Sequence, residues 1–82
     1  MPYIKQSKRL ALDLGKVARV SGELNYTITM IIQAYLDDHG KSYSTMSEIV
    51  SALELSKDEF QRRVVHPYED EKIKENGDVY YV

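Results

Sequence analysis

Residues 23–40, ELNYTITMIIQAYLDDHG, carry the clearest secondary-structure pattern in this chain of 82 residues. Apolar side chains recur there at helical spacing, and one stripe collects Leu24, Ile28, Ile31, Ile32 and Tyr35. Ser21 is a plausible N-cap, and Gly40 supplies a stop at the other end. The many β-branched residues make a strand the competing prediction. The length of the pattern and its two terminal signals favour a helix.

A second helical pattern precedes this stretch. Leu10, Leu14, Val17 and Ala18 recur at helical spacing, which predicts a helix over residues 7–20. Gly15 weakens that helix by roughly 1 kcal/mol relative to alanine. A break at residues 21–22 separates the two helices.

A third helix follows, and its length depends on how residues 55–59 are interpreted. Ser44 or Thr45 can cap it, and Thr45 with Glu48 fits the capping-box spacing. Ser56 and Glu59 also match a capping box, which favours a break. A helical stripe of apolar residues with one lysine in it favours continuity, and it contains Met46, Val50, Leu53, Lys57, Phe60 and Val64.

The C-terminal stretch contains a proline and an Asn-Gly pair. Pro67 lacks a backbone N–H and its ring clashes with the preceding turn, so it kinks or restarts the helix. We expect a short helix from Pro67 to about Glu75, a turn at residues 76–77, and Tyr80 folded back against its own or a neighbouring subunit. The fold predicted is all-α, a small bundle of three to four helices with a short irregular or turn-like C-terminal tail, in one domain spanning residues 1–82.

Composition limits the classes of function. The chain has no cysteine and only two histidines, so neither a disulfide nor a typical structural zinc site is expected. No apolar run approaches the roughly 18 residues of a membrane span, and the N-terminus lacks a signal-peptide pattern, so we expect a cytoplasmic protein. A domain this small often gains stability by self-association, which predicts a homo-oligomer.

One candidate architecture is a winged helix for DNA binding, built from residues 46–82. It would turn at residues 55–56, begin a recognition helix at Lys57, and form a wing around Asn76-Gly77. The acidic pair Asp58-Glu59 would then face DNA phosphates. Residues 54–82 also carry eight acidic and five basic side chains, which argues against this class.

Arg62 and Arg63 are the most suggestive polar residues. They could form a solvated face paired with Glu59 or Glu69, or they could bind a phosphate or carboxylate. His66 has no serine or cysteine nucleophile marked beside it, so we predict no catalytic residue and no enzyme.

Tyrosine is unusually frequent, with seven tyrosines against one phenylalanine and no tryptophan. A tyrosine ring is apolar with a polar tip, which suits interfaces and base-stacking sites. We expect Tyr26, Tyr68 and Tyr80 at an interface, and Tyr35 at the edge of a small core.

Three segments carry a family resemblance: MPYIKQ (residues 1–6), GELNYTIT (22–29) and RRVVHPYEDEKIKENGDVY (62–80). They resemble a family of short uncharacterised proteins from bacteriophages, prophages and environmental viral genomes. The resemblance implies a viral origin but no activity, and it favours a continuous helix over residues 44–66. In the family pattern, alanine commonly stands at His66, an aromatic residue at Gln61 and glycine at Tyr81, which argues against essential roles there.

The leading hypothesis is a small viral accessory protein that acts by binding, as a homo-oligomer and without a cofactor or metal. It would counter a host defence by sequestering a nucleotide or by occluding a host protein. For a nucleotide, Arg62, Arg63 and Lys72 would hold phosphates and Tyr68 or Tyr80 would stack on a base. Asn25 would read a base or ribose edge, with Tyr26 beside it. The runner-up is the winged-helix DNA-binding regulator.

Overall fold

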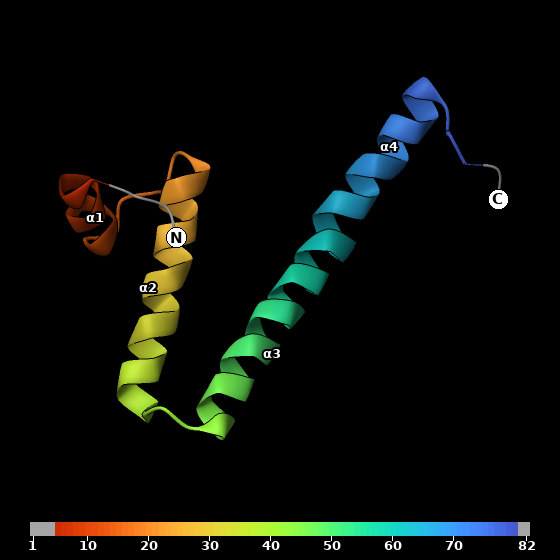
Figure 1. The fold of residues 1–82 in the computed structure, drawn as a ribbon. Coiled ribbons are helices and arrows are strands. Elements are labelled where there is room, and N and C mark those ends of the chain that lie inside the picture. Colours follow the sequence, from red (N-terminus) through yellow and green to blue (C-terminus); the bar gives the residue numbers. More distant parts are fainter. Residues whose placement is uncertain (1–4, 81–82) are drawn as a thin grey trace. The chain divides into compact units, whose positions relative to one another are not determined.

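A computed structural model describes residues 5–80, so the first four residues of the MPYIKQ segment, with Tyr3, and Tyr81 lie outside the described residues. The predicted all-α class is confirmed, with helices α1 (Gln6–Asp13), α2 (Ser21–His39), α3 (Tyr43–Phe60) and α4 (His66–Asn76) and a π-helical turn η1 (Gln61–Val65) (Figure 1). Residues 5–80 contain no strand, and a short tail follows α4. The chain divides into two compact units, Met1–Ile49 and Val50–Val82.

Helix α1 is shorter than the sequence pattern predicts. It ends at Asp13, so the prediction that it reaches residue 20 is wrong. The Gly15 N–H bonds to the Leu12 carbonyl at 3.0 Å, and the Lys16 N–H bonds to the Ala11 carbonyl at 3.1 Å. These two bonds form a Schellman motif, in which Gly15 adopts a positive φ of 96° and stops the helix.

Helix α2 matches the predicted stretch, although its N-cap does not. The N-cap is Val20 rather than Ser21, which lies in the first turn. The Glu23 carboxylate stabilises this end by accepting a 3.0 Å hydrogen bond from the Arg19 N–H. At the other end Gly40 adopts φ 85° and ψ 157°, a backbone region essentially restricted to glycine.

The core of the first unit lies where α1 packs against α2. Leu12 and Tyr26 are its buried members, with 7% and 9% of their surface exposed. The Tyr26 hydroxyl donates to both carboxylate oxygens of Asp13, at 3.0 and 3.1 Å. Burial and this bond to the Asp13 carboxylate raise the pKa of Tyr26 above its ordinary 10.0.

Ser42, and not Ser44 or Thr45, caps helix α3. Its Oγ accepts a 3.1 Å hydrogen bond from the N–H of Thr45, a buried residue in the first turn. The predicted Thr45–Glu48 capping box is therefore wrong. Glu48 instead accepts a 2.6 Å hydrogen bond from the Tyr35 hydroxyl, a bond that raises the pKa of Tyr35.

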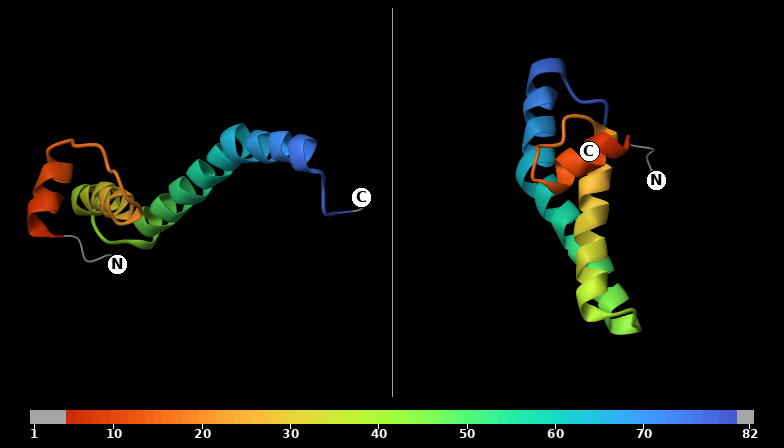
Figure 2. Two further views of the ribbon diagram at one scale, coloured as in Figure 1. Left: turned by 90° about the horizontal axis from the view of Figure 1, so that it is seen from above. Right: turned by 90° about the vertical axis from the view of Figure 1, so that its left-hand side faces the viewer.

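The helix continues through Ser56, so of the two alternatives left open there the continuous helix is the one confirmed. Before Pro67 the backbone changes to π-helical geometry, and the His66 N–H bonds to the Gln61 carbonyl five residues back. Pro67 offers no N–H and disrupts a regular α-turn, which the wider turn accommodates. The ribbon changes direction at this point (Figure 2). Helix α4 ends at Asn76, one residue beyond the predicted end, and Gly77 follows with φ 84°.

Candidate functional site

The predicted site residues fall in both units. Asn25 and Tyr26 lie on α2 in the first unit. The other five lie in the second: Arg62, Arg63, Tyr68, Lys72 and Tyr80. Within the second unit the structure brings Arg62 together with Arg63, and Tyr68 together with Lys72.

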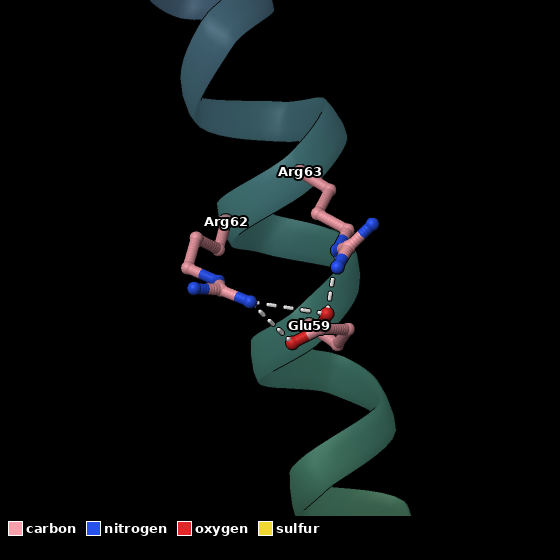
Figure 3. A network of polar contacts seen from close by, with 3 residues as sticks. All are labelled: Glu59, Arg62 and Arg63. Carbon is pink, nitrogen blue, oxygen red and sulfur yellow. Dashed lines mark hydrogen bonds and ion pairs between the residues drawn. The ribbon is translucent and has the colours of Figure 1, made fainter.

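Glu59, Arg62 and Arg63 form one cluster, with both guanidinium groups turned toward the same carboxylate (Figure 3). The Arg62 Nη2 lies 3.1 Å from both Glu59 oxygens, and the Arg63 Nε lies 2.5 Å from Oε1. The arginines follow Glu59 by three and four residues, which is the spacing that places helical side chains together. The pairing with Glu59 that the first alternative expects is present, and binding of a phosphate or carboxylate by the two arginines stays a prediction.

The ion pairs within the cluster are weak, and two arginines against one glutamate leave the cluster with a net positive charge. Its side chains are 52% (Glu59), 71% (Arg62) and 70% (Arg63) exposed. An exposed ion pair of this kind stabilises a protein by about 1 kcal/mol at most. Two guanidinium groups share one carboxylate, so an acidic group of a partner can compete with Glu59 for their N–H donors.

Lys72 and Tyr68 form a second contact on α4. The Lys72 ammonium lies 5.4 Å from the centre of the Tyr68 ring and 3.2 Å from a Glu75 oxygen. The ring face that would stack on a base is therefore in contact with a lysine of the same helix. His66 lies close to Glu69, with its Nδ1 3.5 Å from Oε1.

The remaining three predicted residues differ in their surroundings. Tyr26 is buried between α1 and α2, and its hydroxyl is bonded to Asp13. Asn25 is exposed, and its backbone carbonyl accepts a 2.9 Å bond from the Thr29 hydroxyl. Tyr80 is exposed in the tail, and its N–H donates to Asp78 at 3.0 Å. A site role for these residues stays a prediction.

Sequence reasoning missed Asp13 as the partner of Tyr26. The two residues are thirteen positions apart on different helices, and no local pattern links them. The second unit also contains six apolar side chains that we call the apolar seam. Its members are Val50, Leu53, Phe60, Val64, Val65 and Tyr68.

Residues 5–80 contain no group of three or more histidine, aspartate or glutamate side chains placed to hold a metal ion. In the same residues, no helix is both long and apolar enough to cross a membrane.

Comparison with known families gives one match. The model of a family described as Domain of unknown function (DUF6899) covers residues 1–79. The chain belongs to this family. Searches of curated proteins and of solved structures found no match. Membership agrees with the expected uncharacterised family.

Proposed function

We propose that this chain is a small accessory protein of viral origin that counters a host defence by binding and not by catalysis. In this proposal it works as a homo-oligomer in the cytoplasm of the host cell, and its target is a host protein whose working surface it occludes. The viral origin rests on the resemblance of the MPYIKQ, GELNY and RRVV segments.

The supporting observation is the helical surface of the second unit. Between Val50 and Asn76 every residue is exposed except Gln61 and Val65, which are half-buried. One face of this helix is apolar and another carries the Glu59–Arg62–Arg63 cluster. A helix that presents apolar and charged side chains in this way suits recognition by another protein.

Nucleotide sequestration, the other form of the hypothesis, has less support. It needs phosphate donors and a stacking ring around one ligand. Here Arg62 and Arg63 gather at Glu59, while Lys72 and Tyr68 form a separate contact on α4, and among residues 5–80 no hydrogen bond, ion pair or ring contact joins the two arginines to the stacking ring. The DNA-binding alternative also loses support, because residues 5–80 contain neither the predicted turn at Ser56 nor a wing strand.

The test has two parts. Host proteins that cross-link to this chain in bacterial cells are identified and purified. Each is then titrated with the purified chain in a calorimeter, and one of them is expected to form a complex of defined stoichiometry. The double variant Arg62→Glu/Arg63→Glu should weaken it at least about tenfold, since it reverses two charges. Lys74→Glu, an exposed change on α4, should not. A purified chain that instead binds one of a panel of cyclic and linear nucleotides stoichiometrically, and no protein, would refute occlusion.

A further inference from the structure

We infer that the apolar seam is the surface through which two copies of this chain bind each other. The inference rests on the proposed function in one respect, since it names the surface that would hold the homo-oligomer together. The surface lies entirely on the helix of the second unit.

The seam lies along one face of the helix. An α-helix turns by about 100° per residue, so Val50, Leu53 and Phe60 share a face. The π-helical turn η1 adds about one residue to its turn, which rotates the following side chains back by about 100°. This rotation places both Val64 and Val65 on the seam side and keeps Tyr68 there. Without it, Val65 would lie outside the seam.

Within its own unit the seam has no covering element. Residues 50–80 form the end of α3, then η1, α4 and the tail, so this part of the chain offers no second helix to pack on the first. In proteins most helical stability comes from packing of an apolar face. The seam therefore needs a partner.

The exposed area fits a second copy. Five of the six seam residues are 43–61% exposed. This corresponds to roughly 600 Å² of side-chain surface in each copy, or about 1,200 Å² for a pair, the lower end of the range for stable interfaces. Most soluble homo-oligomers use one patch twice around a two-fold axis, and an unbroken helical face can pair with itself in this way.

Polar residues support pairing in one register. Lys57 lies on the same helix face as the seam, between Leu53 and Phe60, and its ammonium is 3.4 Å from a Glu54 oxygen of the same helix. A single charged residue in an apolar seam favours the register in which its charge reaches solvent. The Glu59–Arg62–Arg63 cluster shares no residue with the seam, so assembly would leave it open to a host protein.

The first test compares two leucines two positions apart on α3. Leu53 is in the seam, whereas Leu55 lies about 160° around the axis and is also exposed. By light scattering coupled to size exclusion, the wild type should have the mass of a dimer or a larger oligomer. Leu53→Lys should raise the dissociation constant at least about 100-fold, because it buries an unpaired charge. Leu55→Lys should keep the wild-type mass.

The outcomes separate the two proposals. If Leu53→Lys leaves the oligomer intact, the seam is not the contact surface, and the proposed homo-oligomer still stands. If the wild type is monomeric at every concentration, both the seam contact and the homo-oligomer are refuted. Occlusion of a host protein is tested separately, by calorimetry of the complex with that protein.

A second measurement covers the case in which Leu53→Lys fails to fold. The chain has no cysteine, so Leu53→Cys and Leu55→Cys can each carry a single nitroxide label. The label at position 53 should be immobilised at oligomeric concentrations and released on dilution, while the label at position 55 stays mobile. Equal mobility at the two positions, or immobilisation that dilution does not change, would overturn the inference.

Discussion

Replacement of Leu12 by alanine should loosen α1 from α2, whereas the same replacement at Leu14 should not. Both leucines lie at the C-terminal end of α1, two positions apart. Leu12 is 7% exposed, and Leu14 is 80% exposed. Leucine and alanine are both good helix formers, so the pair isolates burial from helix propensity.

The expected magnitude follows from the packing. Leu→Ala at a buried site costs about 2–5 kcal/mol, from lost transfer energy and from the cavity left behind. A contact between two helices can partly collapse around the gap, so we expect about 2–3 kcal/mol for Leu12→Ala. Leu14→Ala should stay within about 0.5 kcal/mol of the wild type, since its side chain is already in water.

Urea unfolding followed by circular dichroism measures the free-energy change, and hydrogen exchange locates it. The amides of α1 should exchange faster in Leu12→Ala and remain unchanged in Leu14→Ala. Equal losses of stability for the two variants would refute the assignment of Leu12 to the core. So would unchanged exchange in α1 of Leu12→Ala.

Three further predictions concern the chemistry of single positions. The raised pKa of Tyr26 means that its hydroxyl stabilises the fold fully below pH 10 and loses this contribution as the pH rises through the folded pKa. Between pH 8 and 11 the melting temperature should therefore fall less steeply with pH for Tyr26→Phe than for the wild type. An unchanged slope would contradict the Asp13 bond. Gly40→Ala should cost about 1–3 kcal/mol, because alanine is strained at φ 85° and ψ 157°. Gly77→Ala, at φ 84° and ψ 155°, should cost less stability, because only the tail must rearrange. A larger loss for Gly77→Ala than for Gly40→Ala in urea unfolding would contradict this explanation. Pro67→Ala restores a backbone N–H and should raise the helical circular dichroism signal; a decrease would contradict the role of Pro67 in the π-helical turn.

Local signals predicted part of the fold. The periodic stripe and Gly40 located α2, and Asn76-Gly77 marked the end of α4, because these features depend on residues close in sequence. The signals failed where two local options compete. Ser56 and Glu59 match a capping box, yet Glu59 binds Arg62 and Arg63 and the helix continues. Gly15 was expected only to weaken α1, but its Schellman hydrogen bonds end the helix.

The candidate site shows the same division. The sequence by itself determined that Glu59 could pair with Arg62 and Arg63, because a helix brings residues three and four positions apart together. The tertiary structure decided that Tyr26 is a core residue. Its hydroxyl bonds to Asp13, a residue thirteen positions away on another helix. A pairing of that kind depends on how the two helices pack, and the spacing of residues within either helix does not specify which residues of the other helix they meet.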